Sequence, residues 1–254
     1  MTLSETINFI KLNFKQTYIP ISQYDYELNS FFPKLNPKYL FRGEFIYPST
    51  KSSYHRLIET NPPYLQELNH YTIDLAIFLL KLFHPKLVSN SLEYKYARNE
   101  VGGYLQHYGF PIMNLDFTKN IDVAAFFASY KNNLLEGQIC VVETEALISN
   151  NYEIIKLCNS RAKRPILQEA YSIRMYNDKP DLKEADSLNS KWFRFTLTES
   201  DKLQFENKQL LSTSDDIISE IIIKYIQDNK PKDKLLAEKL NEIKHELHAK
   251  KNWV

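Results

Sequence analysis

Glycine scarcity is the feature that most limits what this chain can form. The 254 residues contain only five glycines, whereas glycine makes up about 7% of an average protein. The sequence contains neither a G-x-x-x-x-G-K-[S/T] loop nor a G-x-G-x-x-G turn, which excludes both glycine-rich devices for holding a phosphate. We expect each glycine to mark a position where a side chain cannot be accommodated. The five are Gly43, Gly102, Gly103, Gly109 and Gly137.

The charge balance gives the chain no general attraction to nucleic acid or to an anionic membrane. Lys and Arg number 32 and Asp and Glu number 31, for a net charge of +1. The two cysteines, Cys140 and Cys158, stand in no ligand-spaced cluster, which indicates a reducing compartment. No apolar run reaches the roughly 18 residues of a membrane span, and the N-terminus lacks a signal-peptide pattern. We therefore predict a cytoplasmic protein with no membrane partner.

Hydrophobic periodicity predicts an α+β protein with mixed or antiparallel sheets, N-terminal helices and a C-terminal helical pair. Ser4 is expected to cap the first helix, and the chain from there to residue 36 is expected to pack irregularly. Residues 109–117 are expected to form an extended connection. Further helices are predicted over residues 65–83, 92–107, 120–130, 215–227 and a last segment with Leu236, Leu240, Ile243 and Leu247 on one stripe. Strands are predicted over residues 38–47, 138–144, 152–157, 168–174 and 192–198.

The same pattern predicts three segments along the chain. Residues 1–36 are expected to form an N-terminal helical segment, residues 37–212 the main domain, and residues 213–254 two helices packed on the same body. The last helix carries Glu242 and His245 in an E-x-x-H pattern. Because no second such pattern supplies further ligands, we interpret it as a polar helix face and predict no metal site.

Three motifs in chain order resemble the FRG domain family. The first reads LFRGE, residues 40–44, and the second reads LQHYGFPIMNLDFTKNIDVAAFFAS, residues 105–129. The third, RPILQEAY at residues 164–171, is similar to the family's Arg followed by Q-x-G-x-F, but it has Ala170 for the glycine and Tyr171 for the phenylalanine. The second motif also departs from the family, with Ile112 and Met113 where relatives tend to have Thr and Arg. The resemblance covers roughly residues 38–200.

The motif order is also similar, more distantly, to that of ADP-ribosyltransferases. This resemblance implies a split sheet, a cleft that takes a small nucleotide ligand, and NAD as a substrate rather than a bound cofactor. It implies catalytic roles for Arg42, Gly43 and Thr118, and for whichever of Gln168 and Glu169 faces the cleft, since alternate residues of a strand point to opposite faces. Glutamine there would leave the site without the negative charge that stabilises an oxocarbenium-like transition state.

The resemblance further implies a set of ligand-binding residues around the cleft. Arg42 would contact a phosphate or a ribose, the bare backbone of Gly43 would reach a carboxamide, and aromatic rings would cover the nicotinamide. We expect Arg42, Asp116 and Gln168 to line one concavity. The ligand-binding candidates are Phe41, Glu44, Gln106, His107, Tyr108, Gly109, Asp116, Phe127, Arg164 and Tyr171.

Each of these residues also has a purely structural interpretation. Arg42 can form an ion pair with Glu44 or Asp116 that fixes the strand, and His107 can be a hydrogen-bonded brace. Asp116 can act as an acceptor at a helix N-terminus. Arg164 can belong to a solvated cationic cluster, although phosphate contact is an alternative.

Three functions therefore stay open at the level of sequence. The first is an NAD-consuming ADP-ribosyltransferase or NAD glycohydrolase, such as a bacterial toxin or an antiphage defence effector acting on a protein target. The second is a non-catalytic module that binds a nucleotide or another signal and transmits it to a partner protein through the C-terminal helices. A protein or nucleic-acid adaptor has the weakest support, because the net charge is close to zero.

Overall fold

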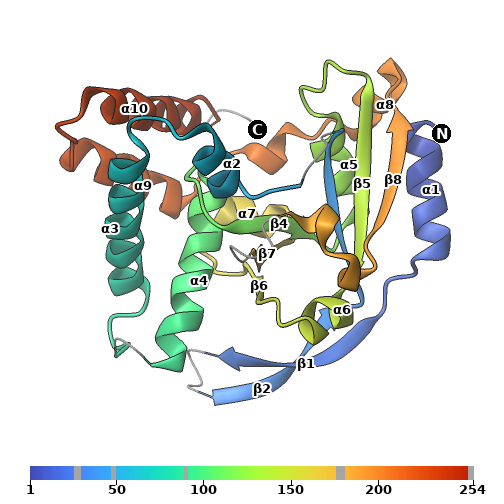
Figure 1. The fold of residues 1–254 in the computed structure, drawn as a ribbon, viewed down its shortest axis with the longest axis horizontal. Helices are drawn as coiled ribbons and strands as arrows, with labels where there is room; N and C mark the ends of the chain where they lie inside the picture. The colour runs from blue at the N-terminus through green and yellow to red at the C-terminus, as the bar shows by residue number, and fades with distance from the viewer. Residues whose placement is uncertain (26–29, 47–49, 89–90, 176–180, 251–254) are drawn as a thin grey trace.

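One six-stranded antiparallel sheet organises the protein, whose computed structural model describes residues 1–25, 30–46, 50–88, 91–175 and 181–250 (Figure 1). The strand order is β6-β7-β4-β3-β5-β8. The predicted α+β class with antiparallel strands is confirmed. The strands are β3 Tyr39–Phe45, β4 Asn114–Thr118, β5 Glu136–Glu143, β6 Ile154–Lys156, β7 Ala170–Arg174 and β8 Lys191–Thr196.

The sheet consists of two halves that meet at a single residue pair. β3 pairs with β5 along its whole length, from Tyr39 opposite Glu143 to Phe45 opposite Gly137. It pairs with β4 only where Phe41 lies opposite Thr118. Figure 1 shows β4 running across the direction of β5 rather than beside it. Beyond Phe41 the two halves diverge, although the strands belong to one sheet. The split sheet that the likeness to ADP-ribosyltransferases implies stays a prediction.

Helices cover the β3–β5–β8 half of the sheet on one face. α5 (Ile121–Ser129) packs directly on β3, and α1 (Leu3–Asn13) packs against α5 and β8. α1 begins with a capping box in which Thr2 and Glu5 bond reciprocally, so the expectation that Ser4 is the cap was wrong. The Ser4 hydroxyl instead donates to Asp201, which ties α1 to α8 (Glu199–Phe205). The two helices therefore hold the first residues of the chain against the end of β8.

A second core lies under the helices of the other half. It joins α3 (Leu65–Phe83), α4 (Leu92–His107), α9 (Ile217–Asp228) and α10 (Lys234–Ala249). The predicted C-terminal helical pair is confirmed, and the apolar stripe of α10 is buried as its periodicity indicated. The remaining helices are α2 Ser53–Thr60, α6 Thr144–Ser149, α7 Lys163–Leu167 and the short 3₁₀ turns η1 Leu182–Glu184, η2 Asp186–Leu188 and η3 Lys208–Leu211.

Several further expectations about local structure were wrong. The chain after α1 forms a separate hairpin of β1 (Tyr18–Asp25) and β2 (Ser30–Pro37) instead of packing irregularly. Prolines within both segments hide the strand pattern, because proline is tolerated only in exposed or edge strands. The last part of the expected connection 109–117 is a strand, β4. The first strand ends at Phe45, and Tyr47, expected to be its last residue, lies outside the described residues.

Another correction concerns the start of β7. The sequence predicted a strand over residues 168–174, but Gln168 is the C-terminal cap of α7 and Glu169 has a left-handed backbone with φ of 47°. The strand begins only at Ala170. A tight turn therefore separates Gln168 from the sheet, and the alternation of faces expected for Gln168 and Glu169 does not apply.

Candidate functional site

A cavity of about 320 Å³ opens where β3 and β4 diverge. Its wall combines these two strands with the C-terminal end of α4, the first turns of α5, and side chains from α7 and η3. The two main sequence motifs thus form one wall, as expected. The lining residues are Phe41, Arg42, Gly43, Glu44, Phe45, Gln106, His107, Asp116, Phe117, Thr118, Val123, Ala124, Phe127, Arg164, Gln168 and Leu211.

Most of the predicted site residues meet at this cavity. Arg42, Asp116 and Gln168, which we expected to share one concavity, all line it. They come from β3, β4 and the end of α7, which lie far apart in the sequence. The other predicted residues at the cavity are Phe41, Gly43, Glu44, Gln106, His107, Thr118, Phe127 and Arg164.

Three predicted ligand-binding residues lie elsewhere. The hydroxyl of Tyr108 donates to Asp216 at 2.6 Å in the interior, and burial raises the pKa of this phenol well above its usual value. Tyr171 belongs to the core beneath the sheet. Gly109 is exposed after α4 with φ of 95°, a conformation that favours glycine, so it ends the helix rather than lining the cavity.

Glu169, which we considered together with Gln168 for a catalytic role, also lies outside the cavity. It forms an ion pair with Lys119 at 2.7 Å and accepts a hydrogen bond from Asn120 at 2.9 Å. Partial burial opposes ionisation, but these two partners lower the pKa of Glu169 on balance. Gln168 lines the cavity instead, so this part of the wall carries a neutral amide rather than a carboxylate.

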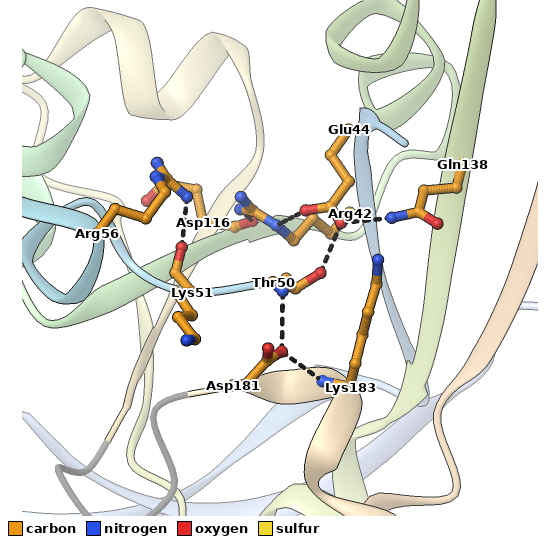
Figure 2. Close-up of polar contacts among 9 residues, drawn as sticks. All are labelled: Arg42, Glu44, Thr50, Lys51, Arg56, Asp116, Gln138, Asp181 and Lys183. Carbon is orange, nitrogen blue, oxygen red and sulfur yellow. Dashed lines mark hydrogen bonds and ion pairs between the residues drawn. The ribbon is translucent and has the colours of Figure 1, made fainter. Parts of the chain in front are cut away.

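The Arg42 side chain ties the two half-sheets together (Figure 2). Its Nε donates to Glu44 Oε2 at 3.0 Å, and its Nη1 donates to the backbone carbonyl of Asp116 on β4 at 2.8 Å. The structural interpretation of Arg42 as an ion-pair partner of Glu44 is therefore correct. Its second contact is to the backbone of Asp116, not to the carboxylate. Arg42 also lines the cavity, so the structural role does not remove it from the site.

Glu44 is fully occupied by protein partners. It is only 8% exposed, and its Oε1 accepts from the Thr50 hydroxyl at 2.6 Å and from the Gln138 amide at 2.7 Å (Figure 2). Asp181 in turn accepts from the backbone N–H of Thr50 at 2.8 Å. A carboxylate that accepts from this many donors is held in one position. Its geometry suits orienting Arg42 better than reacting with a ligand.

Gly43 is required by packing against α5. A Cβ atom at this position would lie 1.7 Å from the backbone carbonyl oxygen of Ala124. Only a residue without a side chain allows the helix to approach β3 so closely. Packing against α5 is therefore sufficient to explain why residue 43 is glycine. The expected contact of its backbone with a carboxamide stays a prediction.

Thr118 also makes contacts within the protein. Its hydroxyl donates to the backbone carbonyl of Gln168 at 2.8 Å and accepts from the N–H of Asn120 at 3.0 Å. These two bonds fix the end of β4 next to the turn that holds Gln168. The expected contact of Thr118 with a ribose stays a prediction.

Arg164 is a buried cation inside the cavity wall. It is 3% exposed, and its guanidinium donates to the backbone carbonyls of His107 and Leu211. Among the described residues no carboxylate lies within ion-pair distance of this guanidinium. Burial lowers the pKa of Arg164, while Tyr108 and Asp216 counteract that effect. The interpretation of Arg164 as part of a solvated cluster was wrong.

His107 and Asp116 face each other across the cavity wall. His107 Nε2 lies 3.3 Å from Asp116 Oδ1, in an orientation that does not form a hydrogen bond. Burial lowers the pKa of His107, and the positive charge of Arg164 adds to this effect against the opposing charge of Asp116. A neutral imidazole beside a carboxylate therefore occupies this part of the wall.

Four buried side-chain atoms of the cavity lining make no hydrogen bond to the described part of the protein. They are Gln106 Oε1, His107 Nε2, Asp116 Oδ1 and Arg164 Nε. Buried polar atoms in folded proteins are almost always hydrogen-bonded. These two acceptors, one donor and one imidazole nitrogen therefore leave hydrogen-bonding capacity unused in the cavity wall.

Several lining residues were missed by sequence reasoning. Phe45 could have been found, since it shares the face of β3 that carries Phe41 and Gly43. Leu211 could not, because it comes from a 3₁₀ turn far along the chain that no motif marks. Its carbonyl nevertheless holds Arg164, and its side chain closes the cavity near α5.

The described residues contain no group of three or more His, Cys, Asp and Glu side chains that could hold a metal ion. Among them, no helix combines the length and apolar character that crossing a membrane requires.

The comparisons with known proteins identify the motif region. The model of the FRG domain matches residues 37–136, which include β3, β4, α5 and the first two motifs. The third motif, at residues 164–171, lies outside the match, and the predicted domain boundaries at residues 37 and 212 stay predictions. No curated protein and no solved structure matches the chain. The chain carries an FRG domain.

Proposed function

We propose that this protein binds a small nucleotide-class ligand in the cavity between β3 and β4. The observation that carries the proposal is the set of four buried polar atoms in one cavity wall that lack a hydrogen bond to the described residues. A cavity of about 320 Å³ is at the lower end of the range for small-molecule sites. It suits a mononucleotide, or one half of a dinucleotide such as NAD with the other half at the mouth.

The chemistry of the wall matches the parts of a nucleotide. Phe41 and Phe127 offer apolar ring surface for a base or a nicotinamide. Gln106 Oε1 and Asp116 Oδ1 can accept from ribose hydroxyls or from ring N–H groups. The guanidinium of Arg164 suits a phosphate, because it is planar, permanently charged and held by two carbonyls.

Ligand-dependent thermal stabilisation tests the binding function. We expect AMP, nicotinamide mononucleotide or NAD to raise the melting temperature of the wild-type protein, since a ligand at 100 times its Kd adds about 2.7 kcal/mol of stability. Gln106→Leu should fold normally, because Gln106 Oε1 has no hydrogen bond to lose, yet it should bind the ligand more weakly.

Lys239→Met, on the outer face of α10, is the matched control and should respond like the wild type. If none of the three nucleotides shifts the melting temperature at millimolar concentration, the proposal is wrong. An unchanged response in Gln106→Leu would place the binding site elsewhere.

NAD cleavage is a second candidate, favoured by the Asp116 carboxylate beside the cavity. Breaking the bond between nicotinamide and ribose develops positive charge on the ribose, which a nearby carboxylate stabilises. Gln168 is neutral and Glu169 lies outside, while Glu44 is held by three partners, so Asp116 is the carboxylate that this chemistry would use. The nicotinamide leaves with the bonding electron pair, and water or a nucleophilic side chain of a target protein takes its place on the ribose.

Nicotinamide release separates this reaction from simple binding. If the protein cleaves NAD, Asp116→Asn should lower the rate by about 10²- to 10³-fold while NAD still stabilises the fold. Stabilisation by NAD without any release of nicotinamide would leave a non-catalytic nucleotide-binding module. In that case the C-terminal helices are the proposed route to a partner protein.

A further inference from the structure

Three positively charged residues act on one another electrostatically, and we call them the basic cluster: Arg164, which lines the cavity, Lys131 and Lys250. Arg164 and Lys250 are attached to the same short segment after η3. Arg164 Nη2 donates to the carbonyl of Leu211 at 2.8 Å, and the backbone N–H of Thr213 donates to the carbonyl of Lys250 at 3.2 Å. This segment brings the end of α10 beside the buried guanidinium.

Lys131 reaches the same region from α5. It follows the helix with a left-handed backbone, φ of 54°, and its Nζ lies 5.4 Å from the centre of the Tyr130 ring. Tyr130 in turn packs on a small core that contains Leu210 and Leu211. Phe127, one helical turn before Lys131, lines the cavity, so this part of α5 leads from the cavity to the cluster.

The charges of the basic cluster are only partly balanced. Lys250 is 17% exposed and pairs at 3.0 Å with Glu246, whose own side chain is mostly exposed. Burial lowers the pKa of Lys250, and the nearby charges of Arg164 and Lys131 lower it further, against the opposing effect of Glu246. Asp216 accepts from the backbone N–H of Arg164 at 3.1 Å and is the other nearby carboxylate. An anion entering among the three cations would relieve their mutual repulsion.

We propose that the basic cluster binds the phosphate groups of a nucleoside phosphate whose ring lies between Phe41 and Phe127. This inference rests on the proposed binding function and deepens it, because it selects phosphorylated over unphosphorylated nucleosides and gives the ligand a direction. It also makes α10, which lies outside the matched FRG domain, part of the site. The end of the C-terminal helix would thereby be held more firmly in the presence of ligand.

Affinities for adenosine, AMP, ADP and inorganic pyrophosphate, measured by calorimetric titration, test the phosphate site. We expect affinity to rise from adenosine to AMP to ADP. Lys250→Met and Lys131→Met should each lower the affinity for ADP by about tenfold, because each removes a charge-assisted contact. Neither variant should change the affinity for adenosine. Lys239→Met, which also removes an ion-paired lysine from α10, should leave all four affinities unchanged.

The outcomes separate this inference from the proposed function. Equal affinities for adenosine and ADP, unaffected by Lys250→Met, would overturn the phosphate site while nucleoside binding stands. If pyrophosphate binds in a manner that depends on Lys250 but no nucleoside or nucleotide binds more tightly, the basic cluster is an anion site and the nucleotide proposal is wrong. Weakening by Lys239→Met equal to that by Lys250→Met would show a general charge effect and overturn the site.

Discussion

Arg42 shows how one side chain serves both the fold and the candidate site. The backbone ladder between β3 and β4 ends at Phe41, and one residue later the Arg42 guanidinium bonds to the Asp116 carbonyl on β4. The side chain thus replaces ladder hydrogen bonds at the point where the two half-sheets separate. Glu44, held by Thr50 and Gln138, keeps the guanidinium in place. Arg42 thus joins the two strands beside the cavity, at the point where their backbone pairing ends.

Removing the Glu44 carboxylate should therefore destabilise the whole protein. Glu44→Ala leaves Arg42 without its counterion in a largely buried position, which typically costs about 3–5 kcal/mol. Chemical denaturation of the variant measures this loss directly. Glu242→Ala, which breaks an exposed ion pair on α10, is the control and should change stability by less than about 1 kcal/mol. If Glu44→Ala lost as little stability as Glu242→Ala, Glu44 would not be orienting Arg42.

His107 predicts a dependence of stability on pH. Burial lowers the pKa of His107 below its ordinary value of 6.5, so the unfolded chain binds a proton at a pH where the folded protein does not. Stability should fall as the pH drops through about 6.5, at up to about 1.4 kcal/mol per pH unit, until the folded pKa is reached. The carboxylates with lowered pKa, such as Glu169, lose their contribution only below about 4.5.

Melting temperatures of wild type and His107→Gln between pH 5 and pH 8 test this effect. The variant should lose most of the slope between pH 5.5 and about 6.5 because it lacks the titrating imidazole. A slope of the same size in both proteins would assign the effect to another group.

The packing of α5 on β3 is the decisive contact between elements. Ala124 lies so close to Gly43 that the helix backbone would collide with any side chain there. The helix carries Val123, Ala124 and Phe127 into the cavity wall at the same time. One close approach between elements therefore fixes both the strand and one side of the site.

A pair of glycine substitutions tests this contact. Gly43→Ala should prevent folding or cost several kcal/mol, because the new methyl group would lie 1.7 Å from a backbone oxygen. Gly102→Ala, in the middle of α4, meets only Ile112 at 3.5 Å and should stabilise the helix by up to about 1 kcal/mol. Circular dichroism and thermal melting of both variants give the comparison. Normal folding of Gly43→Ala would contradict the described approach of α5.

Hydrophobic periodicity predicted the long helices well. The periodicity of α3 and α4 predicted their bounds at residues 65–83 and 92–107, and α3 ends just before His84 and Pro85. Periodicity failed at Gln168 and Glu169, which it assigned to a strand, because Gln168 ends α7 and Glu169 has a left-handed backbone. Glutamate is not among the residue types enriched in that conformation, so the sequence gives no sign of the turn. The β1–β2 hairpin was not predicted because its prolines mask the alternating pattern of a strand.

At the scale of the whole molecule, the cavity is a product of long-range contacts. Residues of the three motifs form most of its wall, but Leu211 comes from a region that meets the cavity only in the folded chain. Arg164 is the link, because it joins the wall to η3 through a backbone carbonyl and to α9 through Asp216. The candidate site therefore depends on residues on both sides of the matched FRG segment's C-terminal end.

Methyl NMR during nucleotide titration tests the central claim most directly. The methyl groups of Val123 and Leu211 line the cavity, whereas those of Leu203 and Leu235 are exposed at other positions on the molecule. The account predicts that AMP shifts the signals of Val123 and Leu211 in a saturable manner and leaves Leu203 and Leu235 unchanged. Saturable shifts confined to Leu203 or Leu235, or no shift of Val123 and Leu211 at millimolar AMP, ADP or NAD, would contradict it.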